Sequence, residues 1–264
     1  MDTRHIYLSP HLDDVVLSCA GNVAQQAAAG DEVLVVTVFA GDPDLERLSP
    51  FARILHQLWG DPPAPVAVRR AEDRAVMRRL GVSYVHLGFL DAIYRGDPAA
   101  PPYGDLYALF GPPSPLDEPL VEQMVAFLKP LLYGLGLTIL YAPLAVGHHV
   151  DHQLVNAAAL RLSLEGTPRL CFYEDFPYAA GLAPQHDPDS VTAAQARLGG
   201  EWLAETVAID LTAKIETTLL YRSQIVSLFG DEANMRRVME EYTASVAVGT
   251  AASHAERFWQ RLAP

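Results

Sequence analysis

Cysteine is nearly absent from the sequence. Only Cys19 and Cys171 occur in 264 residues, and they lie far apart in apolar surroundings. Small secreted scaffolds that are held together by disulfides need many more cysteines than this. We therefore expect both thiols to be buried and reduced, as in a cytoplasmic protein.

Membrane-targeting features and an excess of basic residues are also missing. No stretch reaches the about 18 consecutive apolar residues of a membrane span, and Met1–Arg4 leads into an apolar segment without the features of a signal peptide. Nineteen Lys and Arg residues stand against 32 Asp and Glu residues, which gives a net charge of −13. Nucleic acids and anionic membranes both need a basic surface, so neither is expected as a general partner.

Apolar segments of strand length alternate with amphipathic segments of helix length along the whole chain. Hydrophobic residues make up 50% of the sequence, and no internal repeat or domain linker interrupts it. The pattern predicts strands over 5–9, 32–40, 83–89, 137–144 and 169–175, a further strand over 202–209, and helices over 13–29, 69–80, 120–132, 151–164, 211–229 and 232–247. This alternation favours a single domain over 1–264 of the α/β class, with a Rossmann-like, mostly parallel sheet and helices on both faces.

Three longer segments carry neither pattern. They cover 41–68, 96–118 and 177–200 and are rich in Pro, Gly, Asp or Ala. Loops of this length in a compact domain serve either as binding loops or as ordinary surface decoration. The sequence favours neither of these two interpretations over the other.

Chemically active residues follow the first predicted strand directly. The string Ser9-Pro10-His11-Leu12-Asp13-Asp14 stands where this strand gives way to a helix. Open parallel sheets bind their ligands at this carboxyl edge. His11 and Asp14 lie three positions apart around the turn and offer an imidazole and a carboxylate to a divalent ion such as zinc. Taken alone, either Asp13 or Asp14 would more commonly cap the helix.

A second cluster follows the predicted strand over 137–144. The string Gly147-His148-His149-Val150-Asp151-His152 contains three histidines and a carboxylate, and it lands on the same edge of the predicted sheet. It is similar to the HxHxDH motif of metallo-β-lactamase-like hydrolases. Gly147, however, stands where the first His of that motif would be, which disfavours a two-metal site of that type.

Together the two motifs supply His11, Asp14 and His152 as three ligands and leave a fourth position for water. Three protein ligands and one open position are typical of catalytic zinc, whereas structural zinc sites are closed and usually contain cysteine. Asp13 could take a proton from water, and the imidazolium of His149 could stabilise an oxyanion or protonate an amine. This set of groups favours hydrolysis of an unactivated amide.

With these motifs, the sequence resembles the LmbE-like (PIG-L) family of N-acetylglucosaminyl deacetylases. The family's (A/S)HPDD motif corresponds to Ser9–Asp14, with Leu12 in place of the usual Pro, and its HxDH motif corresponds to His149–His152. Further family-like residues are Arg69, Glu72, Leu80-Gly81, Leu87–Asp91, Lys214, Tyr221, Ser223, Gln224 and Ala255–Trp259. The resemblance spans nearly the whole chain, and the two motifs are specific mainly in combination.

This resemblance implies a zinc-dependent N-deacetylase that hydrolyses a linear amide, with ferrous iron as the alternative to zinc. The substrate would be an amino sugar or sugar conjugate that carries an N-acetyl or other N-acyl group. The implied metal ligands are His11, Asp14 and His152. Metal-bound water would be the nucleophile and Asp13 its general base, while His149, oriented by Asp151, would be the electrostatic catalyst or general acid.

Substrate contacts are expected at the start of one predicted helix and near two other strand ends. Arg69 begins the predicted helix over 69–80 and is either an exposed helix charge or, as the resemblance implies, an arginine that contacts substrate. Asp91 and Tyr94 follow the predicted strand over 83–89. Residues Tyr173–Asp175 lie at the end of another predicted strand, where recognition of a sugar hydroxyl is conceivable. These positions complete the predicted site.

The sequence departs from some family members at Gly147. Those members carry a Tyr at this position, beside the oxyanion. Tyr94, Tyr173 or Tyr178 could supply a hydroxyl in its place, and the sequence does not choose among them.

Two other classes of function use the same kind of fold. A nucleotide-binding protein would carry a G-x-G-x-x-G loop after its first strand, whereas the carboxylates of Asp13 and Asp14 would repel a pyrophosphate. A non-catalytic sugar-binding, metal-binding or scaffold protein of the same family is the remaining alternative. The expected partner is a small amino-sugar substrate, and a homo-oligomer is compatible with the sequence.

Overall fold

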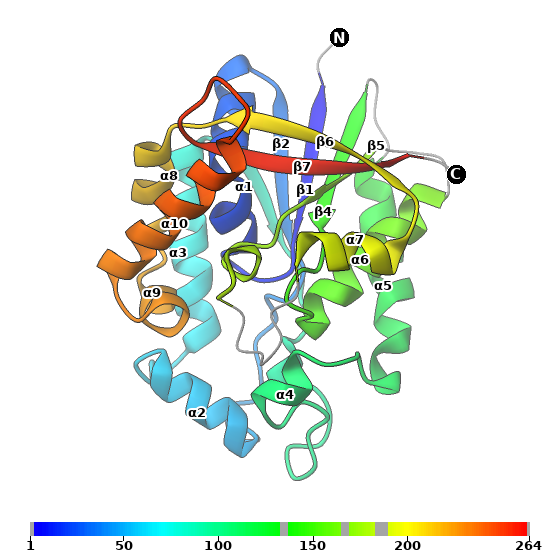
Figure 1. Cartoon of the computed structure of the whole chain (residues 1–264). Coiled ribbons are helices and arrows are strands. Elements are labelled where there is room, and N and C mark those ends of the chain that lie inside the picture. Colours follow the sequence, from blue (N-terminus) through cyan, green and yellow to red (C-terminus); the bar gives the residue numbers. More distant parts are fainter. Residues whose placement is uncertain (1–2, 133–136, 165–168, 183–189, 263–264) are drawn as a thin grey trace.

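The computed structural model of the chain describes residues 3–132, 137–164, 169–182 and 190–262. In these residues, seven strands form one sheet in the order β3-β2-β1-β4-β5-β7-β6 (Figure 1). The strands are β1 (Arg4–Ser9), β2 (Glu32–Thr37), β3 (Ser83–His86), β4 (Thr138–Pro143), β5 (Arg169–Tyr173), β6 (Glu201–Ala208) and β7 (Ala255–Leu262). Strands β1 to β5 pair in parallel, whereas β7 pairs antiparallel with β5 and β6. The mostly parallel sheet that the sequence predicts is therefore confirmed.

Each face of the sheet carries a hydrophobic core, because successive side chains of a strand point to opposite faces. The helices are α1 (Asp14–Ala29), α2 (Pro50–Leu58), α3 (Pro65–Leu80), α4 (Leu106–Leu109), α5 (Glu118–Leu128), α6 (Val150–Leu164), α7 (Val191–Leu198), α8 (Leu211–Thr218), α9 (Arg222–Phe229) and α10 (Glu232–Ala247). On β1, Ile6 and Leu8 pack with α5 and α6. Tyr7 packs on the other face with α1 and α3. Helices thus cover both faces, as predicted (Figure 1).

Helix α2 lies within the predicted loop over 41–68. Its start is fixed locally, because Ser49 Oγ accepts a hydrogen bond from the backbone N–H of Ala52 at 3.1 Å and Pro50 stands in the first turn. The helix is amphipathic but has only nine residues, and in a Pro-rich segment so short a pattern is easily taken for a loop. The sequence therefore misses an element that lies beyond the carboxyl end of the strands (Figure 1).

The other two predicted loops also contain short helices. Helix α4 lies in 96–118, and α7 lies in 177–200, of which 183–189 fall outside the described residues. Both helices begin at a side chain that caps them, Asp105 for α4 and Ser190 for α7. These segments are therefore more ordered than their composition suggests.

The C-terminal part differs from the prediction in two places. The predicted helix over 211–229 is two helices, because the N–H groups of Leu220 and Tyr221 each bond to a carbonyl three residues earlier and so end α8. Strand β7 was not predicted, and it inserts between β5 and β6. The predicted strand over 202–209 is confirmed as β6.

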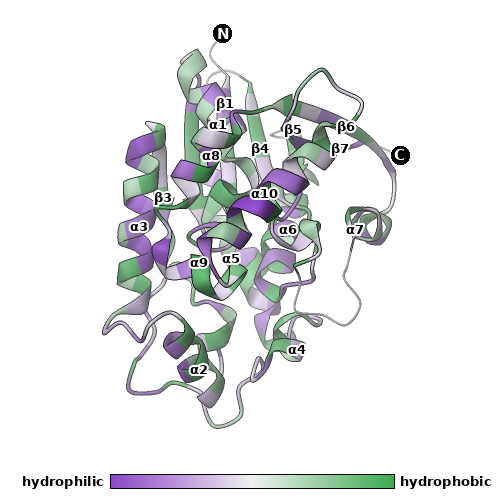
Figure 2. Cartoon of the chain, turned by 60° about the vertical axis from the view of Figure 1, so that its left-hand side comes forward, coloured by the Kyte–Doolittle hydropathy of each residue, from purple (hydrophilic) through white to green (hydrophobic). Residues whose placement is uncertain are grey.

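No helix in the described parts of the chain is both long enough and apolar enough to cross a membrane. The two helices α3 and α10, of 16 residues each, carry many hydrophilic residues (Figure 2). Cys19 and Cys171 are buried free thiols, as predicted.

Candidate metal centre

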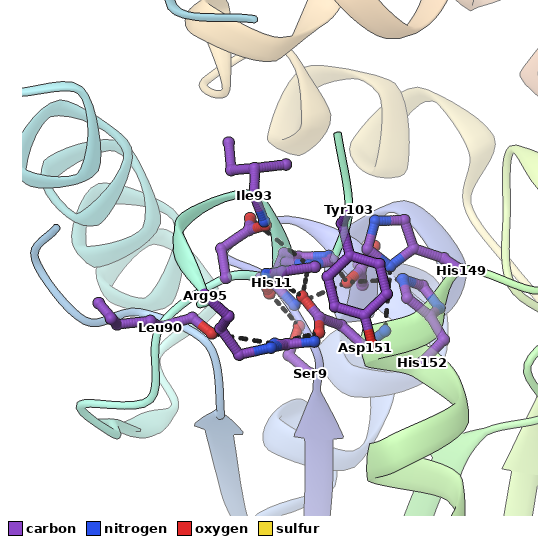
Figure 3. A network of polar contacts seen from close by, with 12 residues as sticks. Ser9, His11, Leu90, Ile93, Arg95, Tyr103, His149, Asp151 and His152 are labelled. Atoms are coloured by element: carbon purple, nitrogen blue, oxygen red, sulfur yellow. Dashed lines mark hydrogen bonds and ion pairs between the residues drawn. The ribbon is translucent and has the colours of Figure 1, made fainter. Parts of the chain in front are cut away.

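The carboxyl edge of the parallel strands brings the two sequence motifs together. His11 and Asp14 follow β1, whereas His149 and His152 follow β4, the neighbour of β1 in the sheet. The ring centroid of His11 lies 4.8 Å from that of His149 and 5.5 Å from that of His152 (Figure 3). Each ring offers a nitrogen atom, and these three atoms lie within 4.8 Å of one another. A compact set of donor groups results.

One oxygen of Asp14 lies close to two of the predicted ligand nitrogens. Asp14 Oδ2 is 3.1 Å from His11 Nδ1 and 3.3 Å from His152 Nε2. It also accepts the backbone N–H of His11 at 2.7 Å, which fixes its position. Ligands at about 2.0–2.1 Å from a tetrahedral zinc ion are about 3.3 Å apart. The spacing of these atoms therefore fits a zinc-sized ion.

His152 presents a nitrogen atom that no hydrogen bond satisfies. Its Nε2 is buried and has no hydrogen-bond partner in the described parts of the chain. Nδ1, on the other side of the ring, is 2.7 Å from Asp175 Oδ1, and Asp175 Oδ2 accepts the backbone N–H of Val146. A carboxylate in this position keeps the proton on Nδ1 and directs the lone pair of Nε2 toward a metal. Burial opposes protonation of His152, but Asp14 and Asp175 raise its pKa to about 9, so the site attracts positive charge.

Asp151 holds His11 in the same manner. Asp151 Oδ2 is 3.0 Å from His11 Nε2 and accepts the backbone N–H of Ala92 at 3.0 Å, while Oδ1 accepts a hydrogen bond from Arg95 Nη1 at 2.6 Å (Figure 3). Burial alone would raise the pKa of Asp151, but Arg95 and His11 lower it below its ordinary value. The carboxylate therefore stays charged and leaves His11 Nδ1 available to a metal.

His149 is oriented by the backbone of Asp151 and not by its carboxylate. The backbone N–H of Asp151 donates to His149 Nδ1 at 3.2 Å, so the proton of a neutral His149 lies on Nε2. Burial and the neighbouring His11 lower the pKa of His149 well below its ordinary value. With this tautomer, a neutral His149 would act as an N–H donor through Nε2 and not as the imidazolium that the sequence suggests.

Asp13 is available for chemistry because it does not cap α1. It occupies the N-cap position, but its side chain makes no capping hydrogen bond. Asp13 Oδ1 is 3.3 Å from Arg69 Nη2, and both side chains are buried and line the same cavity. Burial raises the pKa of Asp13 to about 6, against the opposing effect of Arg69. A carboxylate with a pKa near neutrality is suited to accept a proton and return it.

The three predicted substrate residues have different surroundings. Arg69 lines the cavity, and its Nε has no hydrogen-bond partner in the described parts of the chain. Asp91 lines it as well, with Oδ2 at 3.6 Å from His11 Nε2. The hydroxyl of Tyr94 is instead 2.8 Å from His56 Nε2. The fold thus brings Arg69 and Asp91 to the donor set, whereas Tyr94 is engaged elsewhere.

The donor set opens into a cavity of about 540 Å³. Its charged and imidazole groups are His11, Asp13, Asp14, Arg69, Asp91 and His149. Most of the remaining lining is apolar, and three of its apolar side chains are exposed: Ile54 and Leu58 of α2, each 54% exposed, and Leu106 of α4, 45% exposed. Both helices lie beyond the carboxyl end of the sheet in both views (Figures 1 and 2). The cavity therefore combines a polar end with an apolar rim.

Two supporting residues were missed by sequence reasoning. Arg95 joins Asp151 to Asp117, at 2.6 Å and 2.9 Å, yet it stands 56 positions before Asp151 in an unremarkable turn. Asp175 follows a predicted strand, and this position at the sheet edge was the available signal for it. The sequence linked it only to hydroxyl recognition, because its contact with His152 depends on the packing of β5 beside β4.

A Rossmann-like sheet with a His/Asp donor set at its carboxyl edge defines an α/β protein with a candidate metal site. The family model of PIG-L, GlcNAc-PI de-N-acetylase, matches residues 6–163, which is more than half of the chain. The chain therefore belongs to the PIG-L family, and the resemblance that the two motifs suggested is confirmed.

Several relatives match over nearly the whole chain. A 2'-N-acetylparomamine deacetylase from Niallia circulans is 32% identical over 268 residues, which cover 96% of this chain and 89% of that protein. The zinc-inhibited form of teicoplanin deacetylase has a TM-score of 0.79 and 29% identity, with 98% of both chains covered. The deacetylase of the A40926 pseudoaglycone has a TM-score of 0.75 and 28% identity, with 100% of both chains covered. These relatives place the chain among N-deacetylases, which are hydrolases.

Proposed function

We propose that this chain is a metal-dependent deacetylase of an amino-sugar conjugate. The observation that carries the proposal is the buried Nε2 of His152, which makes no hydrogen bond in the described parts of the chain and lies 3.3 Å from an Asp14 oxygen that is also 3.1 Å from His11 Nδ1. Two imidazole nitrogens and a carboxylate oxygen suit zinc, and ferrous iron would accept the same donors. The deacetylase relatives support the type of reaction.

One residue beside the donor set, Asp13, carries out both proton transfers. A divalent ion held by His11, Asp14 and His152 would polarise the acetyl carbonyl and make water a stronger nucleophile. Asp13 takes the proton from the attacking water. Asp13 then returns this proton to the leaving amine, since neutral His149 is a weak acid.

His149 contributes a hydrogen bond as negative charge develops on the carbonyl oxygen. Its Nδ1 accepts from the backbone N–H of Asp151, so its Nε2–H is the group left for the substrate. A donor fixed in advance in a buried site stabilises this charge at little reorganisation cost. Arg69 holds Asp13 from the other side, at 3.3 Å.

The rim of the cavity favours a substrate with an apolar portion. Ile54, Leu58 and Leu106 expose apolar surface beside the donor set, and covering such surface contributes about 25 cal/mol for each Å². An amino sugar alone would fill the polar end and leave this rim in water. We therefore propose that the natural substrate is an amino-sugar conjugate with an aromatic or alkyl group.

Acetate release from a panel of compounds tests the proposed function. The panel contains N-acetylglucosamine, its aryl and alkyl glycosides, N-acetylated aminoglycosides and N-acetylated glycopeptide glucosaminides. We expect turnover only after metal-depleted protein receives zinc or ferrous iron, and faster turnover with the apolar conjugates. Metal-independent turnover would contradict the metal role. Metal binding without acetate release from any compound would favour the non-catalytic alternative.

A further inference from the structure

Three tyrosines stand near the donor set, and their hydroxyl groups are used differently. Tyr173 donates to the backbone carbonyl of Leu8 at 2.9 Å. The hydroxyl of Tyr94 is 2.8 Å from His56 Nε2. Tyr178 lines the cavity, and in the described parts of the chain its hydroxyl has no hydrogen-bond partner. Of the three, Tyr178 alone presents an unengaged phenol beside the donor set.

The position of Tyr178 depends on the glycine at 147. Gly147 has φ +86°, and a Cβ at that position would lie 2.7 Å from Tyr178 Cβ and 2.8 Å from its Cγ. Any other residue at 147 would collide with the tyrosine as well as adopt a strained backbone conformation. The base of the Tyr178 side chain thus occupies the space that a side chain at 147 would need.

Two further contacts hold the tyrosine over the donor set. Its ring centroid lies 5.5 Å from that of His152, with the rings in an edge-to-face arrangement. The ring of Phe110 lies 5.5 Å from Tyr178 and 5.2 Å from His149, so it packs against both side chains. The backbone N–H of Ala179 donates to the Asp175 carbonyl at 2.8 Å. The backbone next to Tyr178 is therefore hydrogen-bonded to Asp175, whose carboxylate contacts His152.

The phenol of Tyr178 is suited to donate a hydrogen bond. An ordinary phenol keeps its proton near neutral pH, so it can donate one hydrogen bond and does not act as a base. Among the tyrosines in the described parts of the chain, Tyr178 is the one that lines the cavity.

We infer that Tyr178 is a catalytic residue that donates a hydrogen bond to the oxyanion formed from the substrate's acyl carbonyl. The inference rests on the proposed deacetylation. As water adds to the carbonyl carbon, the π electron pair moves to the carbonyl oxygen, and the phenol binds this oxygen without giving up its proton. Tyr178 and His149 then form a pair of neutral donors, with Phe110 packed against both.

The substitution Tyr178→Phe tests the inference, because it removes the hydroxyl and keeps the ring that packs on His152. One oxyanion donor contributes about 10²–10³-fold to turnover. We expect kcat to fall by about that factor, with KM changed less than about threefold and metal content unchanged. The affinity for a methylphosphonamidate analogue of the accepted substrate, measured by calorimetry on the metal-loaded protein, should fall by a similar factor, because the analogue presents the tetrahedral oxyanion.

Tyr242→Phe is the matched control. Tyr242 is a partly buried tyrosine whose hydroxyl bonds to Glu174, and it lies outside the cavity, so loss of this hydroxyl should leave kcat and analogue affinity unchanged. If Tyr178→Phe keeps kcat and analogue affinity near wild type, or weakens substrate and analogue binding equally, the inference is wrong. Absence of turnover in the wild-type protein would overturn the proposed function and the inference together. Wild-type turnover with an unaffected Tyr178→Phe variant would overturn the inference alone.

Discussion

Each histidine of the proposed ligand set has a carboxylate behind it, and the two carboxylates are held differently. Asp151 forms an ion pair with Arg95, whereas Asp175 accepts the backbone N–H of Val146 and contacts no Lys or Arg side chain in the described parts of the chain. The negative charge of Asp175 therefore acts mainly on His152. This arrangement makes His152 a more basic ligand than an unsupported imidazole.

Asp175→Asn should weaken metal binding by about 10–100-fold, because an amide supports the His152 proton less well than a carboxylate does. Competition with a chromogenic chelator measures this affinity directly. Asp73→Asn is the control. Asp73 is likewise a buried carboxylate that bonds to a histidine, at 2.7 Å from His86 Nε2, but it touches no proposed ligand. Equal metal affinity in the two variants would show that Asp175 has no special role.

Alanine substitutions of the two histidines of the HxDH motif should have different effects on turnover and on metal content. His149→Ala should lose about 10²–10³-fold in kcat and keep its metal, since it removes a hydrogen-bond donor. His152→Ala should lose the metal itself, because the unpartnered Nε2 disappears. Elemental analysis of both purified variants, together with acetate release, separates these outcomes. Loss of metal from His149→Ala would mean that His149 is a ligand, as its nitrogen within 4.8 Å of the other two histidines allows.

Among individual site residues, those that the sequence predicts well follow the end of a single strand. His11 and Asp14 are three positions apart, and their contact needs only the local turn after β1. The carboxylate of Asp151 is held by Arg95 and by the backbone N–H of Ala92, and both residues lie in a turn that is distant in the sequence. The sequence therefore predicts Asp151 as a site residue but does not predict its contact with Arg95.

Among the elements, α2 is the one that we propose adds specificity to the site. It projects Ile54 and Leu58 toward the cavity, while Ser49 and Pro50 fix its start. The predicted strands and long helices follow from hydrophobic periodicity. The nine-residue α2 could not be predicted in this way, because its amphipathic pattern ends after nine residues at Trp59 and Gly60. The helix that we propose contacts the apolar part of the substrate was thus not predicted from the sequence.

Replacing both rim residues, Ile54→Ser and Leu58→Ser, should raise KM for an alkyl or aryl conjugate by about tenfold, since about 1.4 kcal/mol of apolar contact is lost. KM for N-acetylglucosamine should stay the same. Leu203→Ser on β6 is the control, because Leu203 is 53% exposed and does not line the cavity. A KM that rises equally for both substrates would show that the variant damages the polar end of the cavity instead.

In the whole molecule, the C-terminal strand that the sequence missed is linked to the helix that begins the site. Glu256 on β7 accepts the backbone N–H groups of Gly21 and Asn22 on α1, and it forms a buried ion pair with Lys214 of α8 at 2.6 Å. Because Asp14 is the first residue of α1, these contacts help to fix the helix that positions one residue of the donor set. The single domain, the cytoplasmic location and the oligomeric state stay predictions.

Glu256→Ala should destabilise the protein by about 3–5 kcal/mol, because it leaves the buried Lys214 charge without its partner and removes the hydrogen bonds from two N–H groups of α1 to Glu256. Urea unfolding of the metal-depleted protein measures this free energy without a contribution from bound metal. A loss below about 1 kcal/mol would mean that water reaches Lys214, and β7 would then contribute little to holding α1.

The central claim is that His11 Nδ1, Asp14 and His152 Nε2 hold a catalytic ion. The most direct test is a zinc-soaked crystal with anomalous diffraction measured on both sides of the zinc edge. We predict a single strong peak within about 2.0–2.3 Å of these three atoms. His11, Asp91 and Asp151 form a second group of donors close enough to share an ion. A peak between those three instead, or no peak at either position, would contradict the account.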